Sequence, residues 1–125
     1  MTKFKFIPIE TLLEMSENNE DFKLIEVLPE EGFKKGHIPG AINMPLDKLE
    51  MLAKERLPKD NLIERSAEGV ASNTRSVPIV VYCASYSCQA SSKGARMLME
   101  MGYENVLDFK AGKKGWVAAG LELAL

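Results

Sequence analysis

The chain has 125 residues, of which 46% are hydrophobic and 27% charged, and this size and balance suit one globular domain, residues 1–125. Its formal net charge of −2 gives no overall attraction to nucleic acid or to an anionic membrane surface. No apolar run approaches the roughly 20 residues of a membrane-spanning helix, and Glu10 and Glu14 interrupt the N-terminal stretch too early for a signal-peptide core. We therefore expect a cytoplasmic protein, where a cysteine pair more often serves catalysis or metal binding than a structural disulfide.

Short apolar runs and helical patterns alternate along the chain. Candidate strands occupy 23–27, 41–45, 78–83 and 105–109, with a candidate edge strand at 4–8. Apolar side chains at helical spacing predict helices over 9–17, 46–56 and 91–101, and a last turn or helix near 114–119. The run PIVVYC at 78–83 is apolar throughout, which is typical of a central strand covered on both faces. This alternation predicts an α/β fold with a mostly parallel sheet between layers of helices.

Two kinds of segment are interpreted mainly as surface. Residues 60–77 have no clean hydrophobic period and form a long excursion between a helix and a strand. Loops of that length are often functional, so a lid or interaction flap competes with plain surface there. The basic pairs Lys34-Lys35 and Lys113-Lys114 are expected to be solvated.

Cys83 ends the apolar strand, and a helix begins about eight residues later, with Ser91 or Ser92 as its expected N-cap. Ligands of parallel α/β sheets bind beyond the carboxyl ends of the strands. If the small, polar loop CASYSCQA curls around the sulfur, the backbone N–H groups of residues 84–88 can point at it, beside the positive end of the helix dipole. Such surroundings lower the pKa of a cysteine and favour the nucleophilic thiolate. Cys83 is therefore the candidate nucleophile, with an inert buried thiol as the alternative.

Three segments of the chain resemble the rhodanese-like domain, a sulfurtransferase family, and together they span residues 24–121. They are the strand and acidic stretch leading into GHIPGAINMP at 36–45, the strand IVVYC at 79–83, and the closing strand, glycine turn and Trp116. The resemblance implies a three-layer α/β/α sandwich around a five-stranded, mainly parallel sheet. It also implies that Cys83 takes a sulfane sulfur as a persulfide, from thiosulfate or another persulfide, and passes it to a thiol, cyanide or a protein acceptor. No metal or organic cofactor takes part in that chemistry.

The sequence departs from the family pattern around the expected site. Where the first strand commonly ends Asp-Val-Arg, this chain has Glu26-Val27-Leu28, and no Lys or Arg occurs from Cys83 to Ser92. The loop is also about two residues longer than the usual six. An arginine fork would hold a sulfonate through charge-assisted hydrogen bonds, so its loss predicts weak activity toward thiosulfate and favours a protein or small persulfide donor. The expected substrate contacts are those of the loop residues Ala84, Ser85, Tyr86, Ser87 and Cys88.

Cys88, His37 and Glu26 each have more than one interpretation. Cys88 could attack a persulfide on Cys83, leaving a disulfide and releasing sulfide, could act with Cys83 as a redox switch, or could only pack against the helix. Two sulfurs and one distant histidine supply no closed metal site. His37 could pair with a cysteine in catalysis or fix its own turn, and the turn is its expected role. Glu26 could act as a general base or hydrogen-bond that turn or the loop amides, and hydrogen bonding is its expected role. Trp116 is expected in the core.

Two other functions compete with sulfur transfer. A cysteine-loop phosphatase or arsenate reductase shares the anion cradle, but it needs Cys-x5-Arg, and the position six after Cys83 is Gln89. A non-catalytic interaction module would keep the fold without the chemistry, although such domains often lose the cysteine that this chain retains. We expect a sulfane-sulfur donor and a thiol or protein acceptor as partners, not nucleic acid or a membrane, and the sequence leaves the oligomeric state open.

Overall fold

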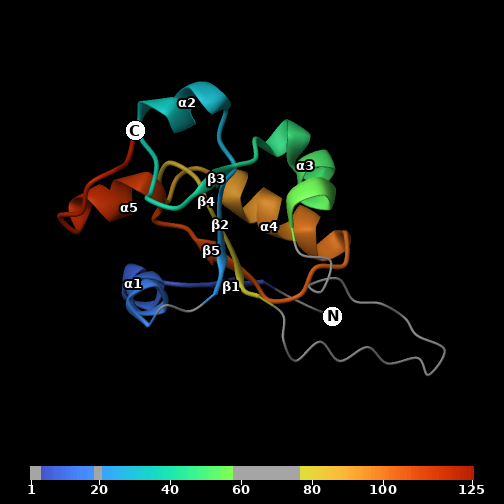
Figure 1. Cartoon of the computed structure of the whole chain (residues 1–125), viewed down its shortest axis with the longest axis horizontal. Helices are drawn as coiled ribbons and strands as arrows, with labels where there is room; N and C mark the ends of the chain where they lie inside the picture. The colour runs from blue at the N-terminus through green and yellow to red at the C-terminus, as the bar shows by residue number, and fades with distance from the viewer. Residues whose placement is uncertain (1–3, 19–20, 58–76) are drawn as a thin grey trace.

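A five-stranded parallel sheet forms the centre of the molecule. The computed structural model describes residues 4–18, 21–57 and 77–125, and its strands lie in the order β1-β5-β4-β2-β3 (Figure 1). All four neighbouring pairs are parallel. The strands are β1 (Lys5–Phe6), β2 (Lys23–Glu26), β3 (Ile42–Asn43), β4 (Ile79–Tyr82) and β5 (Val106–Phe109). The predicted α/β fold with a mainly parallel five-stranded sheet is confirmed.

Helices cover both faces of this sheet, as Figure 1 shows. They are α1 (Ile9–Glu17), α2 (Glu30–Lys35), α3 (Leu49–Arg56), α4 (Ala90–Glu100) and α5 (Gly112–Ala118), with a 3₁₀ turn, η1 (Leu46–Lys48), before α3. The predicted helix at 9–17 is found with the same bounds, whereas α2 was not predicted, because it buries no residue and so carries no apolar stripe. The expected serine N-cap of α4 is wrong: the helix begins at Ala90 and its N-cap is Gln89.

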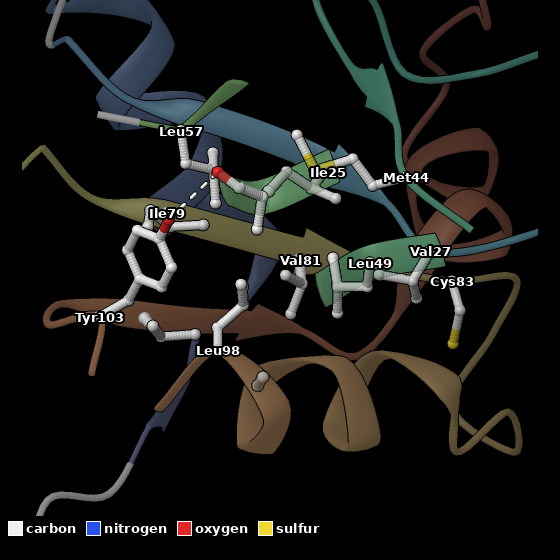
Figure 2. Packing of buried hydrophobic residues seen from close by; sticks show 13 residues of the cluster. Ile25, Val27, Met44, Leu49, Leu57, Ile79, Val81, Cys83, Leu98 and Tyr103 are labelled. Carbon is white, nitrogen blue, oxygen red and sulfur yellow. Dashed lines mark hydrogen bonds between the residues drawn. The ribbon is translucent and has the colours of Figure 1, made fainter. Parts of the chain in front are cut away.

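The core is divided by the sheet into two clusters of buried residues. Alternation along β4 sends Ile79 and Val81 into one cluster and Val80 and Tyr82 into the other, and all four are fully buried. Cys83 continues the alternation and joins the cluster that includes Ile79 and Val81 (Figure 2). The same cluster contains buried residues of α3 and α4. The apolar run of the sequence therefore places the cysteine on the face of the sheet that α4 covers.

Residues 60–77, expected to form a long excursion, lie outside the described residues except for Val77. Across the described residues, no helix is both long and apolar enough to span a membrane. Trp116 is in the core as expected, with 8% of its surface exposed, and its Nε1 donates to the backbone oxygen of Glu122 over 2.9 Å.

Candidate active site

Cys83 lies directly beyond the carboxyl end of β4, at the edge where parallel strands usually present their ligand sites. The residue is fully buried, and its side chain extends past the end of the strand on the α4 side (Figure 2). The loop folds back over it, because Sγ of Cys83 lies 3.4 Å from the backbone oxygen of Cys88 and 3.9 Å from that of Ser85. A backbone hydrogen bond from Cys88 N to Ser85 O, 3.1 Å long, closes the turn.

The start of α5 holds the beginning of this loop. The N–H groups of Lys113 and Lys114 donate to the backbone oxygens of Cys83 and Ala84 over 3.0 and 2.9 Å. Gly112 makes this approach possible: its φ is +61°, and a Cβ there would collide with the carbonyl group of Cys83. Because the C=O and N–H of a trans peptide point in opposite directions, these contacts turn the N–H of Ala84 away from α5 and into the loop.

Cys83 is held as a thiol in this arrangement. Burial raises the pKa of Cys83, and its hydrogen bond to the Cys88 sulfur raises it further, while the hydroxyl and the N–H of Ser91 act in the opposite direction. The pKa of this cysteine therefore lies above its ordinary value. The prediction of a lowered pKa at Cys83 is wrong, because burial and the neighbouring Cys88 outweigh the hydroxyl and N–H of Ser91 that favour the thiolate.

The groups that stabilise a thiolate converge on Cys88 instead. Burial by itself would raise the pKa of Cys88, but the hydrogen bond from the Cys83 thiol, the N–H groups of Ala90 and Ala84, and the charge of Lys110 together lower it. The sequence predicts a cradle formed by the N–H groups of residues 84–88 around Cys83; within that range, the N–H of Ala84 acts instead on Cys88, together with the N–H of Ala90. The pKa of Cys83 is therefore raised and that of Cys88 lowered, and the Cys83 thiol donates to the backbone oxygen of Cys88 over 3.4 Å.

Two further polar side chains complete the site. Ser91 is fully buried in the first turn of α4. Its Oγ has no hydrogen-bond partner among the described residues, and its hydroxyl and N–H favour the thiolate form of Cys83. Lys110, just after β5, donates from Nζ to the backbone oxygen of Cys88 over 3.2 Å and to Oγ of Ser92 over 3.3 Å. Sequence reasoning missed Lys110, whose only signal is its place after a strand that ends at the same edge of the sheet.

The other loop residues form the outer rim. The hydroxyls of Ser85 and Ser87 lie 3.0 Å apart and are hydrogen-bonded to each other at the surface. Tyr86 is 68% exposed. Beside this rim lies a mainly apolar hollow of about 600 Å³, lined by Ala84, Ser85, Lys113, Lys114, Val117 and Ala118. The five expected substrate contacts are consecutive residues of this loop, in which Ala84, Tyr86 and Ser87 are exposed and Ser85 and Cys88 are partly buried.

A buried polar network lies behind the loop. Oε1 of Glu26 accepts a hydrogen bond from the Tyr82 hydroxyl over 2.8 Å, and Oε2 lies 3.0 Å from Nζ of Lys113. The Tyr82 oxygen also accepts from the N–H of Ile38, 3.1 Å away, so Glu26 reaches the turn after His37 through Tyr82. Burial, together with the hydrogen bond to Glu26, raises the pKa of Tyr82 well above its ordinary value. The expectation that Lys113 is solvated is wrong, because its side chain is only 16% exposed.

His37 fixes its turn, as expected. Its Nδ1 lies 3.0 Å from the backbone oxygen of Phe33, and the two rings stack with centroids 3.9 Å apart. Its backbone pairs with that of Ala124 in an isolated antiparallel bridge. Among the residues that the structure describes, no three His, Cys, Asp or Glu side chains gather closely enough to hold a metal ion.

Comparison with known proteins assigns the family. The rhodanese-like domain family matches residues 9–119, and the chain belongs to it. Over 116 residues it is 26% identical to the thiosulfate sulfurtransferase GlpE of Shewanella oneidensis, a match that covers 93% of this chain and 95% of that protein. It is 33% identical over 101 residues to the adenylyltransferase and sulfurtransferase UBA4 of Meyerozyma guilliermondii, which covers 81% of this chain and 21% of that one.

Solved structures agree with this assignment. The Alr3790 protein from Anabaena superimposes with a TM-score of 0.75 at 26% identity, covering 94% of this chain and 90% of that one. The chain spans about half or less of the length of three curated relatives that it matches, from 21% to 49%. The family therefore applies to this domain, and the likeness to longer relatives covers only part of each of them.

Proposed function

We propose that this domain is a sulfurtransferase in which Cys83 carries a sulfane sulfur as a persulfide. One observation carries the proposal: the Cys83 sulfur lies beyond the central strand, where the N–H and hydroxyl of Ser91 at the start of α4 favour its thiolate form. Negative charge on sulfur is favoured at such a helix start, where N–H groups have no partner within the helix. The membership in the rhodanese-like family and the similarity to a thiosulfate sulfurtransferase point to the same chemistry.

Attack on the donor requires that Cys83 lose its proton, and the site contains the acceptor. The Cys88 sulfur is already hydrogen-bonded to Cys83, and the charge of Lys110 and the N–H groups of Ala84 and Ala90 favour its thiolate form. Proton transfer from Cys83 to Cys88 yields the attacking thiolate at Cys83. That thiolate takes the sulfane sulfur from the donor, whose remainder leaves with the bonding electron pair and takes up the proton from Cys88, which returns Cys88 to its thiolate form.

The surroundings of the loop favour an organic persulfide over thiosulfate. In the structure, the hydroxyls of Ser85 and Ser87 bond to each other at the rim, and the hollow beside them is mainly apolar. The Lys113 charge is paired with Glu26 and is not available to a sulfonate. A thiol or protein acceptor then approaches the same hollow, where exposed Tyr86 and Val117 offer apolar contact.

The proposal is tested by mass spectrometry of the protein after exposure to glutathione persulfide or thiosulfate. We expect Cys83 to react with the sulfane sulfur of the donor. Glutathione persulfide should modify a larger fraction of the protein than thiosulfate does. Cys83→Ser and Cys83→Ala should abolish loading and transfer, and two variants are used because either could perturb the buried site. Thermal unfolding of both variants checks that they fold. Transfer that survives in a folded Cys83 variant would refute the assignment and favour an interaction module or another nucleophile.

A further inference from the structure

Cys88 has a chemical environment that packing alone does not require. It is only partly buried, yet the N–H groups of Ala84 and Ala90, the Cys83 side chain and the charge of Lys110 all lower its pKa. A residue that merely filled space at the start of α4 would need none of these polar contacts. They are the contacts that keep a thiolate ready to attack.

The loop also brings the two sulfurs together. The Cys88 N–H donates to Ser85 O, which folds the chain back, and Sγ of Cys83 lies 3.4 Å from the Cys88 backbone oxygen. The two side chains influence each other, because each thiol shifts the pKa of the other. A thiolate in the same closed loop as the inner sulfur of a persulfide needs little movement to displace the outer one.

We propose that Cys88 is the resolving thiol of this site, which attacks Sγ of a Cys83 persulfide and releases the transferred sulfur as hydrosulfide. This inference rests on the proposed function, because it needs the persulfide at Cys83. The bond between Cys83 Sγ and the outer sulfur breaks as the bond between Cys83 Sγ and Cys88 Sγ forms. The outer sulfur leaves as HS⁻ with the electron pair and its own proton. Sulfane sulfur is reduced by two electrons, and the two cysteines are oxidised to an intramolecular disulfide.

A low-molecular-weight or protein dithiol then completes the cycle by reducing the disulfide. The net reaction is reduction of sulfane sulfur to sulfide at the expense of that dithiol. The Cys83 persulfide therefore has two possible reactions. Its outer sulfur passes to an external thiol when one is bound, and it is released as sulfide through Cys88 when none is.

Lys110 acts on this step as a positioning residue. Its Nζ bonds the backbone oxygen of Cys88 over 3.2 Å and Oγ of Ser92 over 3.3 Å, so it ties the end of the loop to α4. Its charge also favours the Cys88 thiolate. We expect Lys110→Met to slow sulfide release by about two- to fivefold, with Lys110→Arg restoring most of the rate. Lys54→Met, which removes an exposed lysine from α3, is the matched control and should leave the rate unchanged.

The decisive experiment treats reduced, desalted protein with one equivalent of glutathione persulfide and measures intact mass, the peptide that carries the modification, and free sulfide. We expect the native chain to lose two hydrogens by linking Cys83 to Cys88 and to release one sulfide per chain. Cys88→Ser should instead keep one added sulfur on Cys83 and release little sulfide. Because the same glutathione is freed in both reactions, the difference between the two proteins measures the part played by Cys88.

The outcomes separate this inference from the proposal on which it rests. If Cys88→Ser loads Cys83 but the native chain also retains its persulfide without a disulfide, Cys88 is not the resolving thiol and the sulfurtransferase proposal stands. Added sulfur found on Cys88 of the native chain would likewise overturn the inference, since the attack would then be on the outer sulfur. Cys88→Ser also lacks the proton acceptor and should load more slowly near neutral pH, so loading is repeated at alkaline pH, where Cys83 ionises by itself. If the folded variant takes up no sulfur at Cys83 there, the sulfurtransferase proposal fails as well.

Discussion

Two groups of buried polar atoms lie near the carboxyl end of the sheet, and they differ in how completely they are paired. In the network of Glu26, Tyr82 and Lys113, Oε1 of Glu26 accepts a hydrogen bond over 2.8 Å and Oε2 forms an ion pair over 3.0 Å. In the cysteine loop, buried Ser91 Oγ has no hydrogen-bond partner among the described residues, and the Cys83 thiol donates to backbone oxygens there.

The paired network holds the scaffold, whereas the cysteine loop carries the groups that we propose to react. Closed pairing fixes three segments of chain relative to one another, because Glu26 belongs to β2, Tyr82 to β4 and Lys113 to α5. Hydrogen-bond donors without a partner remain available to stabilise a negative charge that develops on sulfur. Lys113 connects the two groups, since its Nζ lies beside Glu26 while its N–H holds the carbonyl of Cys83. The paired network thereby sets the position from which the unpaired loop can react.

Removing the charge of Lys113 should have the largest effect on this arrangement. Lys113→Met leaves the fully buried Glu26 carboxylate without its counter-ion, and breaking a buried pair in this way costs about 3–5 kcal/mol. Lys114→Met is the matched control, because the neighbouring side chain is exposed and its backbone N–H is retained. Urea unfolding measures both free energies. Equal midpoints for the two variants would show that the Glu26 pair does not hold the scaffold.

Removing the Tyr82 hydroxyl should have a smaller effect. Tyr82→Phe removes a hydrogen-bond partner from Glu26 Oε1 and from the N–H of Ile38, but it leaves the Lys113 counter-ion in place, so we expect a total loss of about 1–3 kcal/mol. Tyr103→Phe provides the comparison, because that hydroxyl makes one neutral bond, 3.1 Å long, to the backbone oxygen of Ala53. We expect the Tyr82 variant to lose more unfolding free energy than the Tyr103 variant. The opposite order would mean that the network contributes little beyond its ion pair.

The scaffold could be predicted from the sequence more completely than the site. The apolar run of β4 and the family segments around it are local patterns, and they suffice to place Cys83 at the end of a central strand. The direction of each loop amide is not a local pattern, because it depends on the contacts of α5 with the carbonyls of Cys83 and Ala84. Lys110 and Lys113 reach their partners across the fold, so neither their burial nor their pairing could be derived from spacing.

The two thiols are expected to ionise in a fixed order as the pH rises, Cys88 before Cys83. Burial and the hydrogen bond to Cys88 raise the pKa of Cys83, whereas the N–H groups of Ala84 and Ala90 and the charge of Lys110 outweigh burial and lower the pKa of Cys88. Iodoacetamide reacts with thiolates. As pH rises, alkylation of Cys88 should therefore set in below the value of about 8.5 typical of a free cysteine, and that of Cys83 above it.

Peptide mapping of briefly alkylated protein across a pH series measures both midpoints, with the urea-unfolded chain as the control in which the two cysteines should titrate together. Lys110→Met should raise the Cys88 midpoint, and Lys54→Met should leave it in place. Ser91→Ala should move the Cys83 midpoint upward, because the serine hydroxyl favours the thiolate there. Alkylation of Cys83 at lower pH than Cys88 in the folded native chain would reverse the assignment of the proton, and Cys83 would then need no partner to become the nucleophile.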